Sequence, residues 1–193
     1  MQPLTPSDLL SLEAYARERA AFRERVIAHK KARKIHVGGH LTLLFEDRLT
    51  IQYQVQEILR TEKIFEPAGI AEELDAYNPL IPEGRNLKAT LLIEYEDVEV
   101  RKRELMKLRG VEHEIFLQVE GHAQVRAIAD EDLPRSNDEK TSAVHFLRFE
   151  LDERMIADFT RGEDVTIRVA HPACRVEQQL NGEQRRALAR DFD

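Results

Sequence analysis

The sequence is poor in the residues that build covalent and membrane-spanning scaffolds. It has one cysteine, Cys174, in 193 residues, so a single chain can form neither an internal disulfide nor a cluster of thiolate ligands. Its strongly apolar runs, such as Leu91-Leu92-Ile93, fall far short of the ~20 residues of a membrane span. The first residues also lack the basic and apolar regions of a signal peptide. We therefore expect a cytoplasmic protein with no membrane segment.

An excess of basic residues is missing as well. Asp and Glu number 36 against 29 Lys and Arg, which gives a formal net charge of −7, whereas a nucleic-acid-binding protein usually presents a broad basic face. The one dense basic cluster is Lys30, Lys31, Arg33 and Lys34. It falls at the end of a predicted helix, where positive charge suits the helix dipole, so we interpret it as a solvated helix end. We expect no nucleic-acid partner.

Recognisable catalytic motifs are missing too. Gly38-Gly39 lacks the further glycine or lysine of a phosphate-binding loop, and no nucleophile elbow or HExxH spacing occurs. His36 and His40 flank the two glycines and, with Glu46, are weak candidates for metal ligands, but a metal needs three or four converging groups. The sequence therefore predicts no metal and no cofactor, names no catalytic residue, and leaves open whether the protein is an enzyme.

What the sequence does contain is a pattern of alternating helices and strands. Helix-start signals at Thr5-Pro6 open a long N-terminal helix within residues 1–34, and residues 35–193 form an α+β body of the same single domain. We predict a mostly antiparallel sheet of about five or six strands with helices packed on one face. The expected strands are 41–45, 87–95, 113–119, 123–129, 144–151 and 165–169, and the expected later helices are 47–61, 66–78, 97–108, 152–161 and 182–189.

The helix predicted at 47–61 carries a polar stripe beside its apolar one. Arg48, Gln52 and Gln56 recur at every fourth position, and Glu57 lies next to them. Two explanations stay open. The stripe satisfies backbone groups of neighbouring strands, or it forms one wall of a ligand or partner pocket. The candidate further walls of that pocket are Tyr77, Asn78 and Arg148.

Two histidines are predicted to point into the core. His113 and His145 share the parity of the apolar residues in their predicted strands. A core histidine is more often a hydrogen-bonded structural residue than a catalyst, yet it is also the place where a shifted pKa would arise. His145 therefore joins the candidate binding site.

Several of these segments resemble a bacterial family of unknown function, DUF3501. The resemblance rests on residues 43–48, Gln52, residues 56–60, Glu62, and residues 77–82, 89–94 and 143–149, and it extends over nearly the whole chain. It assigns no catalytic residue. Members of the family tend to be encoded near rubrerythrin-like proteins and iron–sulfur proteins, so the resemblance implies a role beside peroxide detoxification or electron transfer.

Two functional classes follow. The first is a non-enzymatic accessory protein that docks onto a redox partner, a rubrerythrin-like or iron–sulfur protein, through the first helix or the stripe. The second is a small metal- or cofactor-binding enzyme with a site around the second helix and His145. The missing catalytic motifs favour the first. The sequence does not decide whether the protein forms a homodimer.

Overall fold

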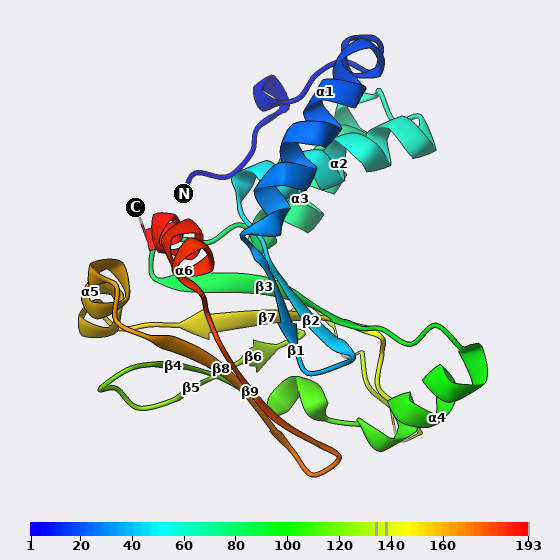
Figure 1. The fold of residues 1–193 in the computed structure, drawn as a ribbon. Coiled ribbons are helices and arrows are strands. Elements are labelled where there is room, and N and C mark those ends of the chain that lie inside the picture. Colours follow the sequence, from blue (N-terminus) through cyan, green and yellow to red (C-terminus); the bar gives the residue numbers. More distant parts are fainter. Residues whose placement is uncertain (134, 138, 193) are drawn as a thin grey trace.

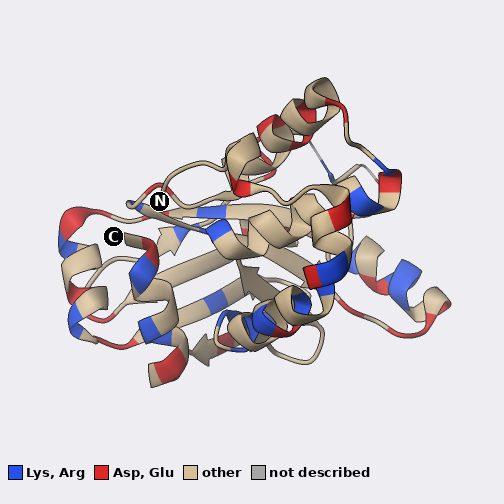
Figure 2. Cartoon of the chain, turned by 90° about the horizontal axis from the view of Figure 1, so that it is seen from above, with Lys and Arg blue, Asp and Glu red and all other residues tan. Residues whose placement is uncertain are grey.

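The molecule combines two β-sheets with a group of N-terminal helices. The computed structural model describes residues 1–133, 135–137 and 139–192. The helices α1 to α3 rise from one end of the sheets, and the two chain termini lie near each other (Figure 1). Acidic and basic residues are interspersed over the helices and loops, whereas the strands are mostly uncharged (Figure 2). The strands therefore supply the core, and the helices and loops present charge to the solvent.

The larger sheet has five strands in the order β1-β2-β3-β7-β6, and each neighbouring pair is antiparallel. A tight turn joins the first two strands, and Gly38 there has φ +72°, a left-handed conformation that glycine adopts without steric cost. The short strand β6 lies at the sheet edge beside β7. The strands are β1 (Lys34–Val37), β2 (Leu41–Phe45), β3 (Asn86–Ile93), β6 (Ile128–Ala129) and β7 (Val144–Glu150).

The smaller sheet has four strands in the order β5-β4-β8-β9, and it is antiparallel throughout. Burial alternates along β4 and β8 as expected of strands with one face in the core. The last strand, β9, is polar and largely exposed at the edge. The strands are β4 (Ile115–Val119), β5 (Val125–Arg126), β8 (Val165–His171) and β9 (Cys174–Gln179).

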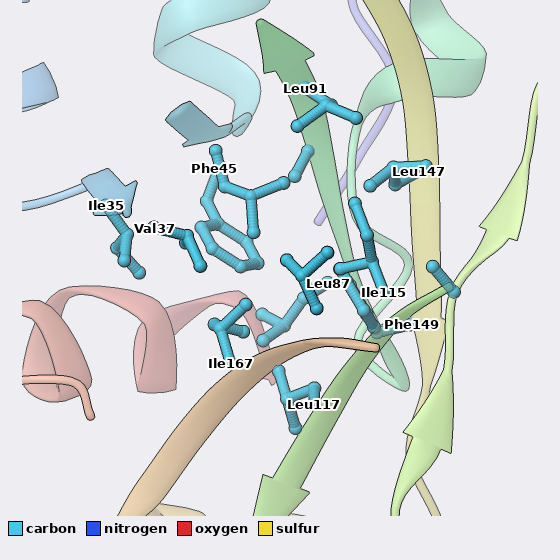
Figure 3. Packing of buried hydrophobic residues seen from close by; sticks show 14 of the residues in the cluster. Ile35, Val37, Phe45, Leu87, Leu91, Ile115, Leu117, Leu147, Phe149 and Ile167 are labelled. Carbon is cyan, nitrogen blue, oxygen red and sulfur yellow. The ribbon is translucent and has the colours of Figure 1, made fainter. Parts of the chain in front are cut away.

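The main hydrophobic core lies between the two sheets. Apolar side chains from the inner face of each sheet meet there, among them Phe45, Leu87 and Phe149 from the larger sheet and Leu117 and Ile167 from the smaller one (Figure 3). The rings of Phe45 and Phe149 lie 6.1 Å apart between centroids. Burial of this apolar surface is the main favourable contribution to folding.

A second, smaller apolar cluster holds the N-terminal helices together. It combines Leu4 with residues of α2 and α3 and with Ile81. Asp47 caps α2 by accepting a hydrogen bond from the backbone N–H of Thr50. The helices are α1 (Leu12–Lys31), α2 (Arg48–Glu62) and α3 (Pro67–Tyr77), and the short 3-10 turn η2 (Asn78–Leu80) follows α3.

The remaining helices lie around the sheets. Asp97, Asp152 and Asn181 cap α4, α5 and α6 through hydrogen bonds to the first-turn backbone N–H groups. The elements are η1 (Pro6–Asp8), α4 (Val98–Lys107), η3 (Val111–His113), α5 (Glu153–Arg161), α6 (Gly182–Ala189) and η4 (Arg190–Phe192).

The predicted α+β class, the antiparallel strands and the long N-terminal helix are confirmed. The structure refines the arrangement in one respect: the strands divide between two facing sheets, so each sheet covers the inner face of the other. Two strands, β1 and β9, were not among the predicted elements. The N-terminal helix also begins later than predicted, because Thr5 caps the 3-10 turn η1 and Ser11 caps α1.

The interpretation of the basic cluster after α1 as fully solvated is wrong for Arg33. This guanidinium is buried and donates to the backbone carbonyl groups of Phe45 (2.9 Å) and Glu46 (2.9 Å). It also pairs with Asp191 of η4 and lies 3.5 Å from Asp47. Arg33 therefore ties the end of α1 to the strand β2 and to the C-terminal turn.

Candidate functional site

The polar stripe of α2 holds a segment of its own chain. Gln56 accepts a hydrogen bond from the backbone N–H of Leu10 (2.6 Å) and donates to the carbonyl oxygen of the same residue (3.3 Å). Gln52 donates to the carbonyl oxygen of Asp8 (2.6 Å). Residues 2–10, which we call the N-terminal strap, thus lie along the face of α2 that the sequence marked as a binding surface.

Arg48 completes this contact at the start of α2. Its Nε donates to the carbonyl oxygen of Gln2 (3.1 Å), and its Nη2 lies 2.6 Å from the Asp8 carboxylate. The Arg48 guanidinium, together with hydrogen bonds from Thr5, lowers the pKa of Asp8 to about 2. The side chain of Asp8 is therefore ionised at neutral pH and paired with Arg48.

Asn78 holds the other half of the strap. It accepts from the backbone N–H of Leu4 (2.8 Å) and donates to the carbonyl oxygen of Leu4 (3.0 Å). The Leu4 side chain is 3% exposed and packs in the second apolar cluster. Asn78 and Gln56 each satisfy both backbone groups of one strap residue, which is how an extended chain would pair with a strand edge.

Glu57 has a different role from its neighbours in the stripe. It accepts hydrogen bonds from the Tyr15 hydroxyl (2.7 Å) and, in bidentate fashion, from Arg19 (2.7 and 2.8 Å). The Arg19 guanidinium is the main reason that the pKa of Glu57 falls to about 2, and burial followed by the hydrogen bond to Glu57 raises the pKa of Tyr15. Glu57 therefore fastens α1 to α2 and does not face the strap.

A separate pocket lies between α3 and β7, and we call it the α3–β7 pocket. It encloses about 450 Å³ and contains two of the predicted site residues, Tyr77 and Arg148. A volume of this size lies within the range of known ligand pockets. Its walls are mainly apolar and are formed by Tyr77, Pro79, Leu80, Phe146 and Leu147.

The two arginines of the pocket are engaged with opposite charges. Arg148 donates two hydrogen bonds of 2.8 Å to Glu131, and it holds the pKa of that carboxyl below its ordinary value. Arg135 donates to both carboxylate oxygens of Asp132 (2.5 and 2.6 Å), and its guanidinium lies 4.5 Å from the ring centre of Phe146. The result is an apolar pocket bordered by ion pairs.

His145 lies behind this pocket, buried within a polar network. Its Nδ1 lies 2.6 Å from the Asp130 carboxylate, and its Nε2 lies 2.8 Å from the Thr141 hydroxyl and 3.1 Å from the carbonyl oxygen of Ser142. A carboxylate and a carbonyl oxygen can only accept hydrogen bonds. Nδ1 therefore donates to Asp130, whereas Nε2 lies within hydrogen-bond distance of both the Thr141 hydroxyl and the Ser142 carbonyl oxygen.

Glu112 supplies the second negative charge of the network. It accepts hydrogen bonds from the hydroxyl groups of Ser136 and Thr141, and one of its oxygens lies 3.9 Å from His145 Nε2. Burial favours the neutral acid, but the Ser136 hydrogen bond and the positive charge of His145 keep the pKa of Glu112 below its ordinary value. The network thus balances buried charge.

The same three residues could also hold a cation. Ligand atoms of Glu112, Asp130 and His145 all lie within 4.8 Å of one another, and two carboxylates with one imidazole suit a divalent transition metal. Asp130 has φ +50°, which is uncommon for a residue other than glycine and often marks functional sites. A metal bound by His145 would replace a hydrogen bond that one of its ring nitrogens makes to Asp130, Thr141 or Ser142.

The weak metal candidates of the sequence are not brought together. His36 and His40 are exposed, and their Nδ1 atoms lie 3.1 Å from the Thr42 hydroxyl and 3.0 Å from the carbonyl oxygen of Glu94. Glu46 is buried elsewhere. It accepts hydrogen bonds from the hydroxyl groups of Thr50 (2.5 Å) and Thr90 (2.7 Å).

The prediction that His113 points into the core is wrong. Its side chain is 60% exposed, because the chain at that point forms the 3-10 turn η3 and the strand β4 begins only at Ile115. The alternation of the strand therefore does not extend back to His113. For His145, within β7, the prediction is confirmed.

Comparison with known proteins identifies a family and a matching crystal structure for this chain. The profile of a family described as a protein of unknown function, DUF3501, matches residues 3–192. The chain belongs to this family. It is also 51% identical to a protein of unknown function from Burkholderia pseudomallei K96243, whose crystal structure it matches with a TM-score of 0.95 over 100% of both chains. A search of curated proteins gives no match.

The matching crystal structure confirms the fold, but membership of DUF3501 assigns no chemical role to any residue. Sequence analysis missed the strap, Glu112 and Asp130. The signal for the strap was the run of two glutamines and an arginine, which indicated a definite hydrogen-bonding partner. Glu112 and Asp130 carry no such signal, since they lie in a 3-10 turn and directly after a short strand.

Among the helices that the structure describes, none combines the length and apolar character that a membrane crossing requires.

Proposed function

We propose that this chain is a non-enzymatic accessory protein that docks onto a protein partner through the α3–β7 pocket. The observation that carries the proposal is the composition of that surface. Its walls are mainly apolar, and its two arginines form ion pairs at the border. Protein interfaces have the same anatomy, with an apolar centre that receives an anchoring side chain and a polar rim.

Exposed apolar side chains beside the pocket support this proposal. Leu133, in the loop that forms one wall, is 53% exposed, and Ile128 on the edge strand β6 is 40% exposed. Ile128 lies directly opposite Arg148 in the register of β6 and β7. Together with the pocket they form a patch that a partner could cover.

The partner that we propose is a redox protein of the rubrerythrin-like or iron–sulfur type, acting in the cytoplasm. The support is the expected gene neighbourhood of the family together with the single cysteine of this chain. One thiolate cannot hold a conventional four-cysteine iron–sulfur cluster. The partner would therefore supply the redox centre, and this chain would supply the docking surface.

Biolayer interferometry against purified rubrerythrin-like and iron–sulfur proteins encoded beside the gene tests the proposal. We expect saturable binding that Leu133→Glu weakens by at least about tenfold, because a charge would have to be buried in an apolar interface. Ile27→Glu is the matched control, since Ile27 is exposed on α1, away from the pocket. Equal loss with both variants, or no binding to any such partner, would contradict the proposal.

A second candidate function is a metal- or cofactor-binding enzyme, and the cluster of Glu112, Asp130 and His145 favours it. Its test is elemental analysis of the protein after incubation with manganese, iron or zinc and removal of the excess. One equivalent of metal that is lost in His145→Gln, and kept in the exposed control His113→Gln, would make this the better assignment.

A further inference from the structure

We propose that α2, α3 and η2 form a groove that binds a peptide of a protein partner, and that the N-terminal strap occupies this groove in the free protein. The peptide would carry a leucine followed, four residues later, by an acidic residue. The strap itself defines this pattern, with Leu4 and Asp8 at those two places. The groove is a different surface from the α3–β7 pocket, and its function does not rest on that pocket.

The leucine is the anchor of the peptide. Leu4 inserts between α2 and α3 and packs in a cluster with Ile51, Val55 and Leu74. Among residues 2–8 it is the one fully buried side chain. A single apolar anchor in a preformed pocket is a common basis of peptide recognition.

The amide side chains of the groove read the peptide backbone. Asn78 engages both backbone groups of Leu4, Gln56 engages both backbone groups of Leu10, and Gln52 engages the carbonyl of Asp8. These contacts involve the peptide backbone alone. Between the two anchors the strap forms the 3-10 turn η1, held by the capping box of Thr5 and Asp8. The groove can therefore accept segments that form such a turn between a leucine and an acidic residue.

Charge selects the second position of the pattern. Arg48 lies 2.6 Å from the Asp8 carboxylate and is partly exposed, so an acidic residue of an incoming peptide can reach it. Charge-assisted hydrogen bonds of this kind are stronger than those between neutral groups. A basic residue at the same place would be repelled.

The strap is built to open locally. Its residues Gln2, Pro3, Thr5, Pro6 and Ser7 are exposed, and it joins no β-sheet. It is held by the buried Leu4, by the partly buried Leu9 and by side chains of the groove. Segments with few buried apolar contacts open at a small fraction of the free energy of global unfolding, so a competing peptide can enter without disrupting the sheets.

Fluorescence anisotropy with a labelled synthetic peptide of residues 1–11 tests the proposal on the full-length protein. The substitution Leu4→Asp in the protein removes the anchor from the strap and frees the groove, and Leu4→Ala is the milder alternative. We call either of these Leu4 variants the loosened protein, and we expect the peptide to bind it about tenfold more tightly than it binds the parent. Circular dichroism and the melting temperature establish that each variant is folded.

Matched substitutions in the protein and in the peptide test whether the peptide binds in the groove. Asn78→Ala in the loosened protein, or alanine in place of the leucine of the peptide, should each weaken binding about tenfold. Gln178→Ala, on the exposed face of β9, should leave it unchanged. Leu133→Glu should also leave it unchanged, which separates this test from that of the α3–β7 pocket.

Three results would overturn the proposal. The first is no saturable binding to either folded Leu4 variant. The second is binding that Asn78→Ala does not affect. The third is exchange of straps between two copies, seen by light scattering as a dimer of the parent protein that Leu4→Asp dissolves, since the occupant would then be a second copy.

Discussion

At the scale of single residues, the fold encloses several ionised groups whose charges depend on one another. Arg33 is fully buried between Asp191 and Asp47, and Asp47 in turn lies 2.5 Å from His29. One oxygen of Asp191 is buried and finds no hydrogen-bond partner among the residues that the structure describes. Burial raises the pKa of Asp191 to about 6.

This raised pKa makes one contribution to stability depend on pH. A group with a raised pKa in the native state stabilises the fold below its ordinary pKa of 3.8 and loses that contribution as the pH rises through about 6. Between pH 4.5 and 7.5 the loss amounts to about 2 kcal/mol. We expect Asp191→Asn to remove this part of the pH dependence in urea melts, and Glu139→Gln, at an exposed acid, to retain it. An unchanged pH dependence in Asp191→Asn would contradict the expectation.

The two histidines at the ends of the same polar network should respond differently to substitution. Replacing His145 by Gln removes the hydrogen bond from Nδ1 to the Asp130 carboxylate and leaves Arg135, 3.3 Å away, as the remaining positive neighbour of Asp130. The loss of this buried hydrogen bond should lower the free energy of unfolding by about 2 kcal/mol. His113→Gln should change it by less than about 0.5 kcal/mol, because the side chain is exposed. Equal effects in denaturant melts would show that the buried contacts of His145 do not stabilise the fold.

At the scale of elements, the structure shows which helices and strands are determined by local sequence signals. The helices capped by Asp47 and Asp152 begin where these capping residues predict, and the last helix begins at Gly182 as expected. The strand β1 was not predicted because two of its four residues, Lys34 and His36, are polar and interrupt an apolar pattern. The strand β9 was not predicted because it is a polar edge strand that is defined only by its pairing with β8.

Only the part of the candidate site that lies on α2 was predictable from the sequence. The spacing of Arg48, Gln52 and Gln56 predicted a definite partner for α2, but not that the partner is residues 2–10. Of the further walls, Asn78 joins the strap, whereas Tyr77 and Arg148 line the pocket. No local pattern specifies such pairings, because the contacts join residues 44 to 74 positions apart, from Gln52–Asp8 to Asn78–Leu4. Folding alone brings them together.

Hydrogen exchange should resolve the strap as a separate element. The amide of Leu4 is protected by Asn78 and that of Leu10 by Gln56. We expect Asn78→Ala to speed exchange at Leu4 and Gln56→Ala to speed it at Leu10, each by at least about tenfold, while the amides of β3 are unaffected. Thr61→Ala, at an exposed position of α2, is the control. Unchanged exchange at Leu4 and Leu10 would mean that other contacts hold the strap.

At the scale of the whole molecule, two apolar clusters share one chain, and the question is whether they unfold together. Arg33 joins α1 to β2 and η4, and α2 follows β2 directly, so the clusters are linked through buried contacts. We expect a single calorimetric transition that dithiothreitol does not shift, since Cys174 is a lone thiol. Two separated transitions would show that the N-terminal helices form their own folding unit.

The three-residue turn η2 separates two surfaces that have been described apart. The side chain of Asn78 holds the strap, while its neighbours Tyr77 and Pro79 line the α3–β7 pocket. The two surfaces therefore belong to one thermodynamic cycle. If a molecule bound in the pocket shifts this turn and changes the affinity of the groove by some factor, occupation of the groove must change the affinity of the pocket by the same factor. Under that condition, release of the strap from the groove would change the affinity of the α3–β7 pocket on the other side of η2.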